Sequence, residues 1–598
     1  MKSTRISTLA LFLLTPTVTA QTQPLPAGYW SEARSGAILE NTETIRLAPD
    51  LSGLTAEQIA AVNDLLAAGA IFQDLYEEAR HHQAIPAREA LDVLARQRGK
   101  EKATENLRLL YRLNQGPIAT TLDNKREAFL PVDPQVSGKN VYPWGITREE
   151  IERHLAASPD KRNDLLGERT MVRRATRENL RRDLDTLARH SVLDTLHPAL
   201  GAMLRKLAEA PEAAVLYAVP YSVAWGDQLI RAHGLIRNAA RRMEASDPEL
   251  ARYLHNRARD LLSNDYESGD ASWVTGRFTI LNAQIGAYET YDDALYGVKA
   301  FHALSLLLQD QKETAELRRA MGSLQEIEDV LPYDQQKRVR DDISVGVYDV
   351  IADFGQARGT NTATILPNDP LFSARYGRTI LLRRNIMRDP AIFGRNQRVF
   401  QAAVNSRFAD HLTPDGEFHR TLWHEIGHYL GVAVDKKGRT LDVALEDNAD
   451  SVEEMKADLV SLFATTLLRR KNVIDDSRLR SVRAGGIRRT LQDNRPRTDQ
   501  PYQRMQLAQF NFFLENGLLT FDPKTTSLVI HDDRYHEVVT ALLRQVLNLQ
   551  YQGDRDAASA FFDRWTRWTP ELHEALAEKI RAAQGARFRI VRYAALGE

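Results

Sequence analysis

Residues 424–428 read His-Glu-Ile-Gly-His, the pattern H-E-x-x-H, inside a segment expected to be helical. His424 and His428 are four residues apart, so both rings project from one face of a helix and can bind one metal ion. Glu425 follows the first histidine and is placed to act as a general base on a water molecule. The pattern is typical of zinc hydrolases, whose metal also needs a third protein ligand and an open position.

A second predicted helix, residues 444–468, carries the candidates for the third ligand. Glu454 and Asp458 are four residues apart and therefore share one side of that helix. We predict that Glu454 binds the metal and that Asp458 accepts a hydrogen bond from the far ring nitrogen of one histidine. Glu453 points elsewhere on the helix and is not predicted as a ligand. The alternative is that these carboxylates face solvent.

The composition is that of a soluble globular protein, with 598 residues, 43% of them hydrophobic. The net charge of -1 argues against nucleic acid as the main partner. Cysteine is absent, so disulfides and thiolate ligands are excluded, and the metal must be held by His, Glu or Asp.

The first twenty residues have the pattern of a signal peptide. Lys2 and Arg5 precede the apolar stretch Ile6 to Leu14, and small or branched residues follow at 18–20. We expect cleavage near Gln21 and an exported, periplasmic or secreted protein without stable membrane association. The alternative is an uncleaved anchor.

Periodicity predicts the elements that position these residues. We expect helices and strands as follows: helix over 54–110, helix over 215–262, strand over 278–285, helix over 300–331, and strand over 379–382. An acidic and phenolic cluster at 287–293 follows apolar sequence, where catalytic groups often lie. A surface turn with two tyrosines would have the same pattern.

Several segments, in this order, resemble the dipeptidyl-peptidase III family of zinc exopeptidases, in its exported bacterial branch. They are Tyr142-Pro143, Tyr266 to Gly269, Ile285 to Asp292, Leu366 to Asp369, His424 to His428, Glu453 to Asp458, and Arg504 to Gln506.

The resemblance implies an α+β, mostly helical protein with two lobes and a wide cleft. The mixed lobe, containing a small β-barrel, is expected at 21–310 with 349–394 rejoining it. The helical zinc lobe is expected at 395–598, with 311–348 as part of it.

The resemblance also implies release of dipeptides from the free N-terminus of short peptides, with one Zn²⁺ per chain. Tyr291 would then donate a hydrogen bond to the developing oxyanion. Glu289 and Asn368 would hold the substrate ammonium, a role suited to a carboxylate and an amide oxygen. Arg504 would also lie in the substrate site.

Three features depart from the family pattern. The histidine spacing lacks one residue of the usual H-E-x-x-G-H, Ile365 stands where an asparagine is expected, and Arg504 stands where a histidine is expected. Two other functions stay open: a zinc aminopeptidase or oligopeptide endopeptidase, and a non-catalytic exported peptide-binding protein.

Overall fold

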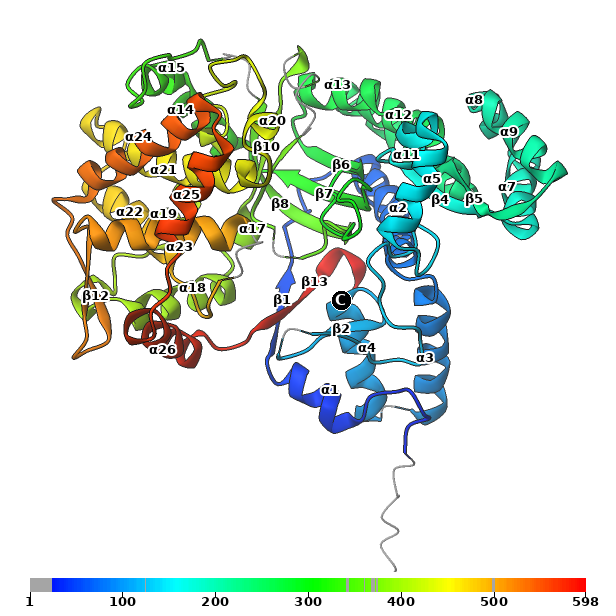
Figure 1. The fold of residues 1–598 in the computed structure, drawn as a ribbon, viewed down its shortest axis with the longest axis horizontal. Helices are drawn as coiled ribbons and strands as arrows, with labels where there is room; N and C mark the ends of the chain where they lie inside the picture. The colour runs from blue at the N-terminus through cyan, green and yellow to red at the C-terminus, as the bar shows by residue number, and fades with distance from the viewer. Residues whose placement is uncertain are drawn as a thin grey trace, which may run out of the picture.

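The computed structural model describes residues 24–99, 101–123, 125–339, 344–359, 361–366, 372, 375–496 and 501–598 (Figure 1). The predicted signal peptide lies outside these residues. Within the described ranges, we find no helix whose length and hydrophobicity suit it to spanning a membrane.

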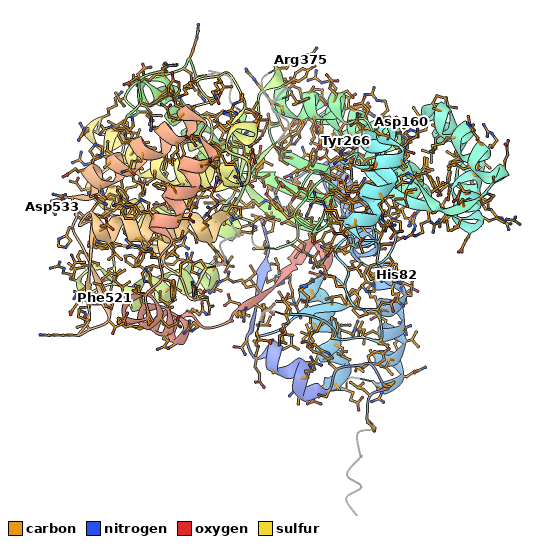
Figure 2. The ribbon with its side chains drawn as sticks, in the orientation of Figure 1. His82, Asp160, Tyr266, Arg375, Phe521 and Asp533 are labelled. Carbon is orange, nitrogen blue, oxygen red and sulfur yellow. The ribbon has the colours of Figure 1, made fainter. Side chains whose placement is uncertain are left out.

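Two large hydrophobic cores organise the chain, and we name the parts around them the mixed lobe and the helical lobe. The mixed lobe contains α1 (Glu32–Leu39), α2 (Ala56–Arg80), α3 (Ala84–Arg98), α4 (Lys102–Asn114), α5 (Arg148–Ala157), α6 (Arg162–Leu165), α7 (Arg177–Arg189), α8 (Ser191–Leu196), α9 (Pro198–Glu209), α10 (Tyr221–Ala224), α11 (Gly226–Met243), α12 (Pro248–Ser263) and α13 (Glu267–Thr275). The helical lobe contains α14 (Gln311–Ala320), α15 (Leu324–Glu328), α17 (Arg384–Met387), α18 (Pro390–Ala403), α19 (Pro414–Gly427), α20 (Leu441–Leu445), α21 (Ala449–Arg470), α22 (Asp476–Thr490), α23 (Pro501–Glu515), α24 (Tyr535–Gln552), α25 (Arg555–Trp565) and α26 (Ala575–Gln584). In Figure 2, Tyr266 marks the mixed lobe and Phe521 the helical lobe.

A five-stranded sheet lies between the two cores, in the order β6-β7-β8-β10-β9. Its strands are β6 (Leu281–Ala287), β7 (His302–Gln309), β8 (Ser344–Gly355), β9 (Ala363–Leu366) and β10 (Thr379–Arg383). Only β8 and β10 run parallel; the other neighbours are antiparallel. The sheet curls into a half-barrel, which is the β structure of the mixed lobe.

Alternation along β10 sends side chains to both lobes. Leu381 belongs to the mixed-lobe core, whereas Ile380 and Leu382 belong to the helical-lobe core, as expected when successive residues point to opposite faces. The sheet is therefore a wall common to both lobes.

Four two-stranded sheets complete the fold. They pair β1 (Thr42–Leu47) with β13 (Phe588–Tyr593), β2 (Ile118–Thr120) with β3 (Arg126–Ala128), β4 (Thr170–Ala175) with β5 (Glu212–Pro220), and β11 (Leu519–Asp522) with β12 (Ser527–Ile530). The β1–β13 pair is parallel and returns the C-terminal segment from the helical lobe to the mixed lobe (Figure 1).

The predicted fold class, α+β and mostly helical with two lobes, is confirmed, while the exact domain boundaries stay a prediction. The strands predicted at 278–285 and 379–382 correspond to β6 and β10. Two helix predictions are wrong in part, because 215–220 belongs to β5 and 302–309 forms β7.

Candidate metal centre

Helix α19 presents both histidines of the H-E-x-x-H pattern. The helix starts after Thr413, whose hydroxyl accepts a hydrogen bond from the Gly416 amide, and it ends at Gly427. His428 is the C-cap and keeps helical angles, with φ -65° and ψ -22°. The two imidazole rings are therefore neighbours, with centroids 4.9 Å apart.

Helix α21 brings Glu454 to the same point. Its Oε2 lies 3.2 Å from His424 Nε2 and 4.0 Å from His428 Nε2. One ligand atom from each of the three residues falls within 4.8 Å of the other two. Glu454 Oε2 is buried, and among the described residues its polar neighbours are the two imidazole Nε2 atoms, so a cation suits this position.

The other ring nitrogens are already occupied by carboxylates. His424 Nδ1 lies 2.7 Å from Asp458 Oδ1, and His428 Nδ1 lies 2.9 Å from Glu453 Oε1. Such pairs fix the tautomer and leave Nε2 as the ligand atom. Two imidazoles and one carboxylate form a donor set that zinc accepts. The residues present therefore fit a bound zinc ion.

Glu453 and Asp458 support the two histidines in equivalent ways. From the sequence we predict this role for Asp458 alone; the prediction that Glu453 points elsewhere is wrong, because its carboxylate lies against His428. On α21, Glu453 adjoins Glu454 by one residue, and both carboxylates face α19. The sequence does show that Glu453 directly precedes Glu454. Consecutive residues on a helix are only about 100° apart, so both side chains can reach the same neighbouring helix.

Asp458 is buried among cations. Burial raises the pKa of its carboxyl, but Arg489, His424 and Arg420 outweigh burial and hold that pKa well below its usual range. For His424 the signs are reversed. Burial lowers its pKa, but Asp458 and Glu454 outweigh burial and raise that pKa to about 9. In the metal-free protein His424 thus carries a proton, which a metal must displace.

The buried ammonium of Lys456 fastens the end of α19 to α21. Its Nζ donates to the carbonyls of Gly427 at 2.7 Å and Leu430 at 2.9 Å, and it lies 2.8 Å from Glu453 Oε1. Gly427 permits this approach, because a Cβ there would lie 2.8 Å from the carbonyl oxygen of Ala457.

Glu425 lies between the two histidines in the last turn of α19, and its side chain is only partly buried. It lies two residues before Gly427, the last residue of the helix.

Glu289 and Tyr291 lie in the mixed lobe, on the loop after β6. Tyr291 is 80% exposed and hydrogen bonds to Glu289. Tyr291 also interacts electrostatically with Glu454 of the metal cluster. The charge of Glu454 therefore contributes to the raised pKa of Tyr291, which lies on the other lobe.

Asp292 anchors one flank of this loop. It accepts hydrogen bonds from Tyr76 at 2.9 Å, Lys139 at 2.6 Å and Gln356 at 3.1 Å, and Arg80 lies 3.4 Å away. Burial raises the pKa of Asp292, but the charges of Arg80 and Lys139 hold it well below its usual range. Tyr291 is therefore exposed on a firmly held backbone.

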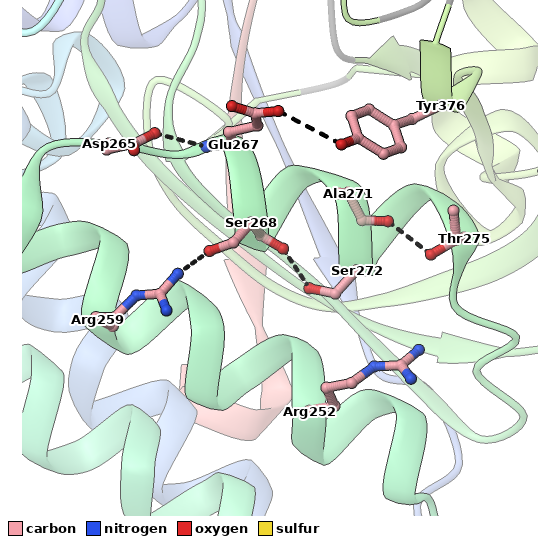
Figure 3. A pocket seen from close by; sticks show the side chains of 9 residues that line it. All are labelled: Arg252, Arg259, Asp265, Glu267, Ser268, Ala271, Ser272, Thr275 and Tyr376. Atoms are coloured by element: carbon pink, nitrogen blue, oxygen red, sulfur yellow. Dashed lines mark hydrogen bonds between the residues drawn. The ribbon is translucent and has the colours of Figure 1, made fainter.

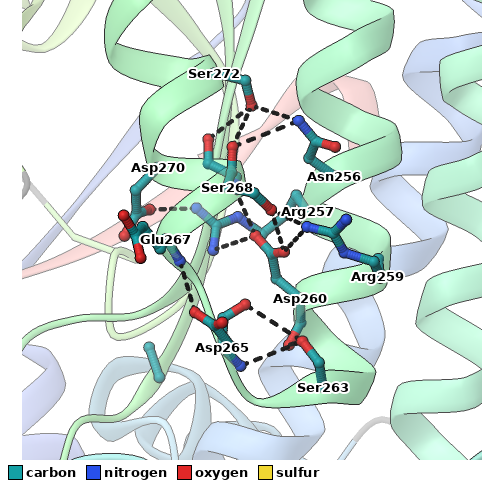
Figure 4. Close-up of polar contacts among 12 residues, drawn as sticks. Asn256, Arg257, Arg259, Asp260, Ser263, Asp265, Glu267, Ser268, Asp270 and Ser272 are labelled. Carbon is teal, nitrogen blue, oxygen red and sulfur yellow. Dashed lines mark hydrogen bonds and ion pairs between the residues drawn. The ribbon is translucent and has the colours of Figure 1, made fainter. Parts of the chain in front are cut away.

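A buried arginine, Arg257, anchors the other flank through Tyr288. Figure 4 shows its contacts with Asp260 and Asp270. Arg257 lies between Asp260 and Asp270 and also donates to the Tyr288 hydroxyl at 2.6 Å. Tyr288 in turn donates to Asp270 Oδ1 at 2.5 Å. This network holds Tyr288, the residue directly before Glu289, in place.

The remaining predicted residues are placed differently. Asn368 lies outside the described residues. The Arg504 guanidinium lies over the ring of Phe562, 4.2 Å from its centroid. Tyr502, two residues earlier on α23, donates to Glu454 Oε1 at 2.9 Å. Tyr502 is not among the residues predicted from the sequence, although it lies two residues before Arg504.

A separate cavity of about 490 Å³ opens on the mixed lobe between α12 and α13 (Figure 3). Its polar groups bond largely to one another, as Ser272 does to Ser268 and Tyr376 to Glu267. In the described part of the chain, none of the predicted site residues lines it. We assign it no role in the site.

Comparison with solved structures identifies the fold. The structure of dipeptidyl-peptidase III from Caldithrix abyssi aligns with a TM-score of 0.79 and 22% sequence identity, over 93% of this chain and 98% of that one. The structure of dipeptidyl-peptidase III from Corallococcus sp. strain EGB aligns with a TM-score of 0.75 and 23% identity, over 95% of this chain and 98% of that one. The chain therefore has the two-lobed fold seen in both structures.

Sequence comparison adds one curated relative. Nudix hydrolase 3 of Arabidopsis thaliana is 27% identical over 369 residues, or 60% of this chain. The chain spans about half of that protein, 47% of its length. No protein-family model matches the chain.

Proposed function

We propose that this protein is a zinc-dependent peptidase that releases dipeptides from the free N-terminus of short peptides. The observation that carries the proposal is the cluster of His424, His428 and Glu454, in which the buried Oε2 of Glu454 faces the Nε2 atoms of both histidines. The fold common to two dipeptidyl-peptidase III structures supports it. The Nudix name belongs to a protein of which this chain covers less than half, so it supports no activity here.

When bound by this cluster, zinc would polarise the scissile carbonyl and lower the pKa of a water molecule. Glu425 takes the proton of the attacking water and passes it to the leaving amine. Tyr291 donates a hydrogen bond to the carbonyl oxygen as negative charge develops on it.

The free N-terminus is recognised on the mixed lobe. Burial raises the pKa of Glu289, and a substrate ammonium that pairs with its carboxylate would offset that cost. Asn368 is proposed to accept a second hydrogen bond from the same ammonium. A peptide without this charge leaves the Glu289 carboxylate without a cationic partner.

Export of the protein is proposed from residues 1–20.

The test is cleavage of short synthetic peptides by the zinc-loaded protein, with matched N-acetylated peptides as controls and products identified by mass spectrometry. We expect dipeptides from the free peptides and no product from the acetylated ones. Single residues or internal cuts would refute dipeptide release. No cleavage of any peptide would overturn the assignment as an enzyme.

A further inference from the structure

Each of the three metal-binding side chains has one partner that fixes its orientation. For the histidines, these partners are Asp458 and Glu453, which lie on the same helix as the third ligand. Glu454 takes its partner from another helix, where the hydroxyl of Tyr502 on α23 donates to it.

This hydrogen bond distinguishes the two oxygens of Glu454. Oε1 accepts from Tyr502 at 2.9 Å, while Oε2 is buried and faces both Nε2 atoms, at 3.2 and 4.0 Å. We propose that Tyr502 is a positioning residue of the metal centre, whose hydroxyl occupies Oε1 of Glu454 and thereby presents Oε2 alone to the metal. The inference rests on the proposed metal site.

The position of the Tyr502 ring is itself constrained. The Arg489 guanidinium lies 5.4 Å from the ring centroid, and Arg489 Nε lies 3.5 Å from Asp458 Oδ2. Arg489 thus contacts the partner of His424 and the partner of Glu454 together. Pro501 opens α23 directly before Tyr502, and its fixed φ suits the first position of a helix.

The exposure of Tyr502 makes the role testable. The residue is 44% exposed, so loss of its hydroxyl does not disturb the packing of the core. In Tyr502→Phe, Oε1 of Glu454 loses its donor, and the carboxylate is free to rotate or to offer both oxygens. Removal of such an outer partner weakens metal binding about 10- to 100-fold.

The experiment measures Zn²⁺ affinity by competition with a chelator, and the visible absorption spectrum of the Co²⁺-loaded protein, in wild type and Tyr502→Phe. Tyr296→Phe is the matched control, because Tyr296 also donates to a glutamate, Glu152, at 3.0 Å but lies in the mixed lobe. We expect Tyr502→Phe to bind Zn²⁺ at least about tenfold more weakly, with altered Co²⁺ bands. Tyr296→Phe should match wild type in both measurements.

Thermal unfolding of the metal-free proteins shows whether Tyr502→Phe is folded as wild type is. Wild-type Zn²⁺ affinity together with an unchanged Co²⁺ spectrum in Tyr502→Phe would overturn the inference while the peptidase proposal stands. A wild type that binds neither ion would overturn the metal centre and this inference together. A wild type that binds zinc but cleaves no peptide would overturn only the peptidase function.

Discussion

Three acids lie at the cluster: Glu453 and Glu454 on α21, and Glu425 on α19. Their surroundings differ, and these differences support the role proposed for each. Glu454 has a buried oxygen that faces both Nε2 atoms, which suits a metal ligand. Glu453 lies against His428 and Lys456, which hold its pKa well below the usual range although burial raises it. Glu425 is partly exposed beside the ligands. Glu425 is thus the acid of this group suited to accept and release protons during turnover.

The substitution Glu425→Gln tests this assignment. The amide keeps the size of the side chain but cannot take a proton, so we expect kcat to fall about 10²- to 10⁴-fold. Zn²⁺ affinity, measured by chelator competition, should stay at the wild-type value because Glu425 is not a ligand. Retention of wild-type turnover would show that another group is the base.

At the scale of elements, the site is built where α19 meets α21. Lys456 bonds to two carbonyls at the end of α19, and Gly427 lets the backbone of Ala457 come close. The histidines and the glutamate come from these two helices, so their spacing depends on this contact. A side chain at Gly427 would push the helices apart.

The substitution Gly427→Ala should therefore destabilise the protein, by about 1–3 kcal/mol in the free energy of unfolding. Gly234→Ala is the matched control, because Gly234 lies in helix α11 with nothing within 4 Å of its would-be Cβ. Replacing such a glycine by alanine stabilises a helix by about 0.5–1 kcal/mol. Urea unfolding measures both variants. Equal stability of the two would contradict close packing of α19 on α21.

At the scale of the molecule, the central sheet belongs to both cores. Leu381 packs into the mixed-lobe core, and its neighbours Ile380 and Leu382 pack into the helical-lobe core. The parallel pair of β1 and β13 joins the lobes a second time. When one lobe unfolds, the sheet face that it covers becomes exposed to solvent. The other lobe packs on the opposite face of the same sheet, so its core is destabilised as well.

Metal removal tests this coupling. Zinc at 100 times its Kd should stabilise the folded protein by about 2.7 kcal/mol. We expect calorimetry to show one transition, shifted as a whole to lower temperature by a chelator. His424→Ala should show no such shift, because it lacks a ligand. Two transitions, of which only one responds to the chelator, would mean that the lobes unfold independently.

The sequence by itself determined the features that depend on local geometry. The i, i+4 spacing places His424 and His428 on one helix face, and the same spacing relates Glu454 to Asp458, whatever the rest of the chain does. The absence of cysteine restricted the possible ligands.

Only the tertiary structure decided the features that depend on packing between distant segments. The apolar run 302–309 suits a buried strand or a buried helix equally, and its pairing with β6 and β8 makes it β7. Glu453 becomes the partner of His428, and Tyr502 that of Glu454, because α21 packs against both α19 and α23. Contacts between helices leave no periodic signal in the chain, so the residues of the candidate metal cluster could be predicted from sequence, whereas the partners that orient Glu454 and His428 could not.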